Sequence, residues 1–157
     1  MQPDHRYLLA CDPGKLSGFV VLDITDFETE EPSVVVAEEF EQQATCSHLH
    51  WWIANAQNIE IVMEDFVITT QTGKKSAVDT RIPLEIIGVG RYFANLYSKP
   101  FTLQKPAAAK NFVDNDRIRD VGLWVKGGAG HHKDAMRHAI LYLVQTAGWR
   151  SSGLLGS

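Results

Sequence analysis

Two short apolar runs near the N-terminus, joined by a turn, constrain the fold of this chain more than any other feature. The first, Tyr7–Cys11, has no charged residue, as in a strand buried on both faces. It stops at Asp12-Pro13-Gly14, and a second run, Phe19–Asp23, follows the glycine-bearing segment 15–18. This order predicts a β-hairpin.

Apolar periodicity in the rest of the chain predicts further strands and helices. They are the strands 33–40, 59–66 and 101–103 and the helices 47–58, 82–96 and about 132–147. Ser47 is expected to cap the first helix, Pro83 to lie in the first turn of the second, and Gly148 to end the third. The polar segment 114–130 gives no prediction. The order β-β-β-α-β-α-β-α predicts an α/β fold, a mixed five-stranded sheet with an N-terminal antiparallel hairpin and helices on both faces.

Composition limits the class of protein. The chain has 157 residues, of which 45% are hydrophobic and 22% charged, which suits one domain over 1–150 and a flexible tail over 151–157. No apolar run approaches the roughly 20 residues of a membrane helix, and the polar Asp4–Arg6 does not suit a signal peptide. We therefore expect a cytoplasmic protein without a membrane partner. Cys11 and Cys46 are expected to be reduced, buried thiols.

The charge of the chain is unevenly distributed. The net charge is −4, but residues 23–65 contain eleven acids and no Lys or Arg, whereas residues 66–137 contain twelve Lys and Arg against six acids. One face can therefore be basic enough for nucleic acid although the whole chain is acidic. A surface with scattered charges is the alternative interpretation.

Four residues form a candidate metal site. Asp12 and Glu64 lie at the ends of apolar strands, where a charge is costly unless it has a cation or partner. His131 and Asp134, three residues apart at the start of the last helix, suit two ligands to one metal. Such ligands favour Mg²⁺, with Mn²⁺ able to substitute, and two ions could clamp a phosphodiester for hydrolysis. The structural alternatives are a turn role for Asp12, an edge charge at Glu64 and a helix-dipole role for Asp134.

Three motifs also carry a resemblance to a known family. They are Leu9–Gly14 with Gly18, the strand-terminal Glu64, and His131-x-x-Asp134-Ala135. They resemble the RuvC-type Holliday-junction resolvases of the ribonuclease H-like superfamily. The resemblance implies a ribonuclease H-like fold and a homodimer that resolves branched DNA, above all the four-way junction, by paired nicks. A compact chain of this kind would suit a phage-encoded relative that acts in the host cytoplasm. The resemblance also implies two metal ions per site and no small-molecule cofactor, with Asp12 bridging both ions, Glu64 holding one, and His131 and Asp134 the other.

Several residues are candidates for DNA contact. They are Lys105, Lys110, Phe66, Lys74, Lys75 and Arg137. By the same resemblance Lys110 ends a Pro-x-x-x-Lys segment and lies near the scissile phosphate as a catalytic residue; a solvated lysine is the alternative. Phe66 could supply a stacking aromatic or be a core residue. The lysines of the polar loop 69–76 suit phosphate contacts, and Arg137 could bind phosphate or pair with Asp134.

Other residues receive structural predictions. His132 points about 100° away from His131 on a helix, so we expect it to be exposed. The tryptophans are expected to pack rather than to stack on bases. They are Trp51, Trp52, Trp124 and Trp149. By the resemblance, the helix 82–91 takes the place of the family's dimerisation helix, so its apolar face is expected to be shared between core and interface.

Three other functions stay open at this point. One is a ribonuclease H-like nuclease acting on RNA–DNA hybrids or on RNA. Another is a non-catalytic DNA-junction-binding protein. The third is a sugar-kinase or actin-like ATPase, whose fold also opens with a strand ending in Asp-x-Gly, but which needs two such domains to close on a nucleotide.

Overall fold

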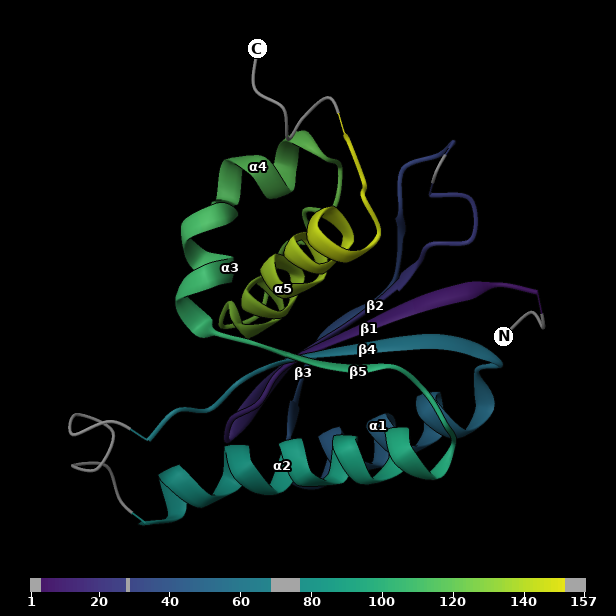
Figure 1. The fold of residues 1–157 in the computed structure, drawn as a ribbon. Helices are drawn as coiled ribbons and strands as arrows, with labels where there is room; N and C mark the ends of the chain where they lie inside the picture. The colour runs from purple at the N-terminus through teal and green to yellow at the C-terminus, as the bar shows by residue number, and fades with distance from the viewer. Residues whose placement is uncertain (1–3, 28, 69–76, 152–157) are drawn as a thin grey trace.

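A computed structural model describes residues 4–27, 29–68 and 77–151 and contains a five-stranded sheet between two layers of helices (Figure 1). The strands lie in the order β3-β2-β1-β4-β5. They are β1 (Arg6–Asp12), β2 (Leu16–Asp23), β3 (Ser33–Glu41), β4 (Asn58–Glu64) and β5 (Phe101–Gln104). The first three strands are antiparallel, whereas β4 and β5 run parallel to β1. The predicted mixed sheet with its N-terminal hairpin is confirmed.

The helices divide between the two faces of the sheet (Figure 1). Helices α1 (Gln42–Asn55) and α2 (Ala77–Leu96) cover one face. Helices α3 (Pro106–Phe112), α4 (Asn115–Asp120) and α5 (His131–Thr146) cover the other. This arrangement confirms the prediction of helices on both faces. Within the described part of the chain, no helix combines the length and apolar character needed to cross a bilayer.

Strand alternation explains why the sheet has two separate cores. In β1, Leu8 and Ala10 belong to the cluster under α5, whereas Leu9 and Cys11 belong to the cluster under α1 and α2. Both sets are fully buried. A strand with apolar residues on both faces must be covered on both, which is why the continuous apolar run of β1 lies at the centre of the sheet.

Two predicted helix starts were wrong. Helix α1 begins at Gln42, directly after β3, and Ser47 lies inside it, where its hydroxyl donates to the Gln43 carbonyl. The apolar pattern did not reveal this start, because the buried residue of the first turn is the polar Thr45. Its hydroxyl donates to the Phe40 and Glu41 carbonyls. Helix α2 begins at Ala77, so Pro83 lies inside it and not in its first turn. Its apolar periodicity starts only near residue 82, after polar residues.

Burial corrects several smaller predictions. Trp52 and Trp149 are buried and Trp124 half-buried, as expected, but Trp51 is 51% exposed because neighbouring helical residues point about 100° apart. Cys46 is half-buried rather than buried. Of the predicted tail 151–157, the structure describes only Ser151, which is buried and donates a hydrogen bond to Glu31. The segment without a prediction contains α4, capped by the Asp114 side chain.

Candidate active site

One row of residues crosses the sheet where the parallel strands end, and we call it the edge row. It consists of Glu39 (β3), Gly18 (β2), Asp12 (β1), Glu64 (β4) and Gln104 (β5). Gly18 pairs with both Glu39 and Asp12, and Glu64 pairs with Gln104. Cys11 pairs with Met63, so Asp12 and Glu64 follow at the same level. Parallel pairing therefore brings the two predicted strand-end carboxylates together.

Helix α5 presents one face to the edge row. His131, Asp134 and His138 are three and four residues apart and so share a side of the helix. His131 Nδ1 lies 3.7 Å from Asp12 Oδ2, and His138 Nε2 lies 2.9 Å from Glu64 Oε2. The structure thus gathers the four predicted ligands at one end of the sheet.

The charges of these carboxylates act on one another. Burial, together with the negative charges of Glu64 and Asp134, raises the pKa of Asp12 to about 7, and the charge of Lys110 partly opposes this rise. The Asp12 side chain is 15% exposed, so little water screens these charges. The negative charge of an ionised Asp12 is therefore poorly compensated by its surroundings at neutral pH.

Two cations lie beside Asp134. Lys110 Nζ, at the end of α3, is 3.5 Å from Asp134 Oδ2. Arg137 donates to the other oxygen of Asp134, and its Nε donates to the Val113 carbonyl at 3.0 Å. Of the two interpretations of Arg137, the structure shows the one in which it pairs with Asp134. The Lys110 side chain is 53% exposed, so it is accessible to solvent.

The chemistry of the donors suits a divalent cation. Three carboxylates and one imidazole are hard and borderline ligands of the kind that Mg²⁺ and Mn²⁺ accept. The raised pKa of Asp12 marks excess negative charge that a cation would neutralise. Across the described ranges, however, no three His, Cys, Asp or Glu side chains are grouped closely enough to hold an ion. Asp134 and Glu64 instead contact Arg137 and His138.

Removing the charge of Asp12 is expected to stabilise the metal-free protein. Because its pKa is raised, the folded state holds the Asp12 proton more tightly than the unfolded chain, so stability falls as pH rises from about 4 and the loss is complete above about 7. A rise from 3.8 to about 7 corresponds to at most about 4 kcal/mol. We expect Asp12→Asn to raise the melting temperature by about 5–10 °C at pH 8 in EDTA.

The pH dependence of this gain is its control. At about pH 3, below both pKa values, the wild-type carboxyl is mostly protonated in both states, so the two melting temperatures should converge there. A difference that stays the same from pH 3 to pH 8 would show that the charge of Asp12 is not its cause. Adding MgCl₂ at pH 8 should stabilise the wild type and not the variant.

Sequence reasoning did not find two residues that hold the site. His138 is 1% exposed and joins Glu64 to Gln104, whose Oε1 lies 2.9 Å from His138 Nδ1. Glu39 accepts hydrogen bonds from backbone N–H groups where α5 begins. Burial tends to raise the pKa of Glu39, but the hydrogen bonds from Ala129, His132, Gly130 and His131 outweigh it and lower the pKa to about 2. The spacing of His138 from Asp134 was the available signal for it.

Loss of the His138 ring is expected to destabilise the fold. His138→Ala leaves a cavity and takes away the partner of Glu64, which is 18% exposed. We expect a loss of about 2–4 kcal/mol in the free energy of unfolding, measured with urea. His50→Ala, which removes from α1 an exposed imidazole that stacks on Phe93, should cost less, about 0.5–1 kcal/mol. Equal losses for the two variants would contradict the bridging role.

The prediction that His132 is exposed was wrong. Its side chain is 4% exposed, with Nδ1 3.1 Å from Glu39 Oε1 and Nε2 3.3 Å from the Val125 carbonyl oxygen. The helical angle does turn His132 away from His131, but the chain before α5 folds back over that side of the helix. A residue facing away from the site is therefore buried against a second surface.

The remaining candidates for DNA contact lie around the edge row or outside the described residues. Lys105 is exposed at the N-cap position of α3, five residues before Lys110. Phe66 is half-buried and packs against the core cluster under α1 and α2, which favours its interpretation as a core residue. Lys74 and Lys75 lie outside the residues that the structure describes.

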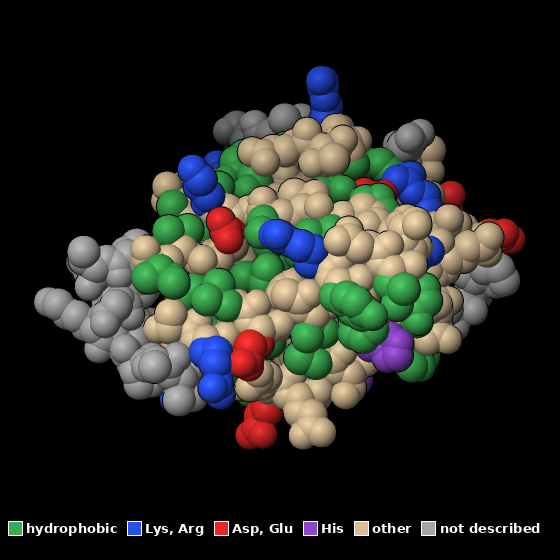
Figure 2. Space-filling model, turned by 60° about the horizontal axis from the view of Figure 1, so that its bottom comes forward, with side chains coloured by type: hydrophobic (Ala, Val, Ile, Leu, Met, Phe, Trp, Pro, Cys, Tyr) green, Lys and Arg blue, Asp and Glu red, His purple; other side chains and the backbone are tan. Residues whose placement is uncertain are grey.

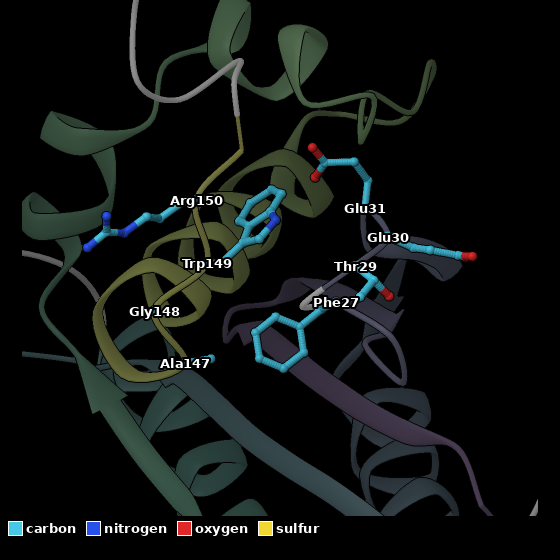
Figure 3. Close-up of a pocket in the computed structure, with 8 residues that line it drawn as sticks. All are labelled: Phe27, Thr29, Glu30, Glu31, Ala147, Gly148, Trp149 and Arg150. Atoms are coloured by element: carbon cyan, nitrogen blue, oxygen red, sulfur yellow. The ribbon is translucent and has the colours of Figure 1, made fainter.

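A pocket at the other end of α5 is unrelated to these residues. It has a volume of about 380 Å³ and is lined by Phe27 and residues 29–31 and 147–150 (Figure 3). Helix α5 has 16 residues and so spans roughly 24 Å, which separates this pocket from the edge row. Figure 3 shows Arg150 and Glu30 pointing in opposite directions, so their charged groups do not converge. The candidate site therefore lies at the ends of the central strands β1 and β4, away from this pocket.

Comparisons with known proteins identify the fold. No protein-family model matches this chain, and neither does any curated protein sequence. Among solved structures, RuvC of T. thermophilus in complex with a Holliday junction substrate superposes with a TM-score of 0.69 and 11% identity, over 92% of this chain and 96% of that chain. A second structure of Thermus thermophilus RuvC gives a TM-score of 0.66 and 13% identity, over 91% and 97%. The chain has the RuvC fold, as its motifs predicted.

Proposed function

We propose that this chain of RuvC fold is a divalent-metal-dependent endonuclease that resolves four-way DNA junctions by paired nicks. The observation that carries the proposal is the convergence of Asp12, Glu64 and Asp134, whose mutual repulsion contributes to raising the pKa of Asp12 to about 7. The likeness to a RuvC structure that holds a Holliday junction supports branched DNA as the substrate. The carboxylates make chemical sense together when cations bind to them.

Four residues share the task of binding metal in this proposal. Asp12, Glu64, His131 and Asp134 would hold the cations, two ions in the two-metal scheme, with Mg²⁺ as the expected metal and Mn²⁺ as a substitute. When bound, such ions supply Lewis-acid activation of the attacking water and neutralise charge that develops on the phosphate. Asp12 and Glu64 are fixed by the ends of two strands, so the positions of these two ligands do not depend on a flexible loop.

Basic side chains around the cluster bind the substrate. Lys110 is close enough to Asp134 for its exposed ammonium to reach a phosphate held at the cluster. Lys105 begins the same helix on the exposed side. Arg137 is tied to Asp134, Val113 and Asn115, so we assign it the task of holding Asp134 in place rather than binding DNA.

Paired nicks require two active sites, and the outer face of α2 suits a homodimer. Figure 2 shows hydrophobic side chains gathered on the α1–α2 side of the molecule. Leu84, Tyr92 and Leu96 are 42%, 61% and 57% exposed at spacings of eight and four residues, so they form one stripe along α2. Tyr97, directly after α2, is also exposed. A two-fold axis through this surface gives each junction two identical sites.

A charge in the stripe is expected to break the dimer. Tyr92→Asp places a carboxylate in the middle of the apolar contact, so the variant should elute as a monomer in size-exclusion chromatography with light scattering at about 20 μM, where the wild type is a dimer. Val35→Asp, on β3, is the control, because it adds the same charge to a residue that is also exposed, at 47%. A wild type that is monomeric at this concentration would overturn the dimer.

A second candidate function is a non-catalytic junction-binding protein. It is favoured by the observation that no three potential ligands are grouped for an ion in the described parts of the chain. Binding of DNA would then use the basic residues alone, with Arg137 and Lys110 neutralising Asp134.

One substrate panel separates these functions. End-labelled four-way junction, flap, linear duplex and RNA–DNA hybrid are incubated with the protein in Mg²⁺, Mn²⁺ or EDTA. Symmetric paired nicks in the junction, absent in EDTA, support the resolvase. Equal cutting of flaps indicates a general branched-DNA endonuclease, and selective cutting of the hybrid indicates a ribonuclease. Tight binding of the junction without cleavage in either metal supports the non-catalytic junction-binding protein.

A further inference from the structure

We infer that Glu39 is the positioning residue of the site: its carboxylate, reaching from β3, sets the first turn of α5 against Asp12. The inference rests on the proposed function, because it assigns a task to Glu39 through His131 and Asp134. Glu39 itself belongs to the edge row, separated from Asp12 by Gly18 alone.

Four consecutive residues bind the carboxylate of Glu39. Its Oε2 accepts from the Ala129 N–H at 2.8 Å. Its Oε1 accepts from the N–H groups of Gly130 and His131, both at 2.7 Å, and lies 3.4 Å from the His132 N. The ring of His132 adds a contact at 3.1 Å. Because the first N–H groups of a helix have no partner within the helix, one side chain from the sheet satisfies the start of α5.

The loop before α5 is shaped around this carboxylate. Gly127, Gly128 and Gly130 have φ values of 97°, 66° and 109°, which residues with a Cβ rarely adopt. A Cβ on Gly128 would lie 2.9 Å from the Glu39 carboxyl carbon. The loop therefore places its N–H groups on Glu39, at a distance that a side chain at position 128 would prevent.

The same turn is in contact with the next strand of the edge row. A Cβ on Gly18 would lie 1.9 Å from the His131 carbonyl oxygen. The backbone of His131 is thus held by Glu39 through its N–H group and packed on Gly18 at its carbonyl. Two neighbouring strands fix the residue that carries the imidazole next to Asp12.

The rest of α5 is held independently of Glu39. Its buried apolar residues include Met136, Ile140 and Leu143, which pack in the core cluster on that face of the sheet. Loss of the Glu39 carboxylate should therefore release the first turn while the helix stays docked. Two ligands of the cluster would then lose their fixed position relative to the two that end strands.

Metal affinity of the DNA-free protein tests this role. Binding of Mn²⁺ to the full chain is measured by isothermal titration calorimetry for the wild type, Glu39→Gln and Glu39→Ala, at a temperature below their unfolding transitions. We expect Glu39→Ala to bind Mn²⁺ about 10–100-fold more weakly, as for other residues that orient metal ligands. Glu39→Gln should lose less Mn²⁺ affinity than Glu39→Ala, because its amide oxygen can accept the hydrogen bonds that Oε1 now accepts.

Cleavage kinetics and a neighbouring glutamate complete the design. On the four-way junction, kcat of Glu39→Ala is expected to fall with its Mn²⁺ affinity while KM for DNA stays unchanged, since no basic residue is removed. Glu38→Gln and Glu38→Ala are the matched controls, because Glu38 is exposed and adjacent on the same strand. Both should bind Mn²⁺ and cut DNA like the wild type.

A folded Glu39→Ala with wild-type Mn²⁺ affinity would overturn the inference. Should that variant fail to fold, unchanged affinity in Glu39→Gln would overturn it instead. A wild type that binds Mn²⁺ but cuts none of the substrates defeats the proposed function, while a weaker affinity of the Glu39 variants would still support the positioning role. A wild type that binds no Mn²⁺ defeats both.

Discussion

Asp12→Asn is expected to lower the rate of junction cleavage by about 1000-fold or more without loss of junction binding. Asp12 lies between Glu64 and the first turn of α5, and in the proposed site it is the ligand shared by both ions. Ions of this kind stabilise the transition state by several kcal/mol, and each 1.4 kcal/mol corresponds to tenfold in rate. The rate is measured under single-turnover conditions in saturating Mg²⁺.

Junction binding and a control variant distinguish a slower cleavage step from weaker DNA binding. In EDTA, a mobility-shift assay should give Asp12→Asn an affinity for the junction equal to or above that of the wild type, because one negative charge near the phosphate is removed. Asp120→Asn, which removes an exposed carboxylate at the end of α4, should cut at the wild-type rate. Cleavage by Asp12→Asn within tenfold of the wild type would remove Asp12 from the metal site.

Gly18→Ala is expected to destabilise the fold and abolish cleavage together. The new methyl group would meet the His131 carbonyl oxygen at 1.9 Å and the His132 N at 2.8 Å, both backbone atoms. Since these atoms cannot rotate away, α5 must move off the hairpin. Overpacking of this kind costs about 1–3 kcal/mol or more, and we expect at least 3 kcal/mol here by urea unfolding.

A second glycine provides the comparison. A Cβ on Gly88, in the exposed face of α2, meets nothing within 4 Å in the single chain, so in the monomeric Tyr92→Asp background Gly88→Ala should raise stability by about 0.5–1 kcal/mol through helix propensity. Gly18→Ala that unfolds at the same urea concentration as the wild type would show that α5 does not rest on this strand. Junction cleavage by Gly18→Ala at the wild-type rate would also contradict this contact between α5 and β2.

The sequence pattern predicted the elements whose signal is local. The apolar run of β1 and the periodicity of α5 predicted a buried strand and a helix at these places, and both are present. Helix α1 was misplaced because its first turn is polar and follows β3 without a loop. Its start depends on what Thr45 contacts, which periodicity does not record.

The candidate ligands were also accessible from sequence, because strand ends and helix starts are recognisable positions. Asp12, Glu64, His131 and Asp134 were singled out by place and residue type, and the structure brings them to one edge. Their charges were not predictable in the same way. The raised pKa of Asp12 depends on burial and on two carboxylates that lie 52 and 122 positions away along the chain.

The sequence by itself determined the order of the strands and of the three longer helices, the alternation that places Leu8 and Leu9 on opposite faces, and the residue types of the four candidate ligands. Only the tertiary structure decided that His132 is buried, that His138 joins Glu64 to Gln104, and that Glu39 holds the start of α5. The reason is physical. Periodicity reports which side of an element avoids water, whereas hydrogen bonds and charge interactions depend on which distant residues the sheet places next to one another.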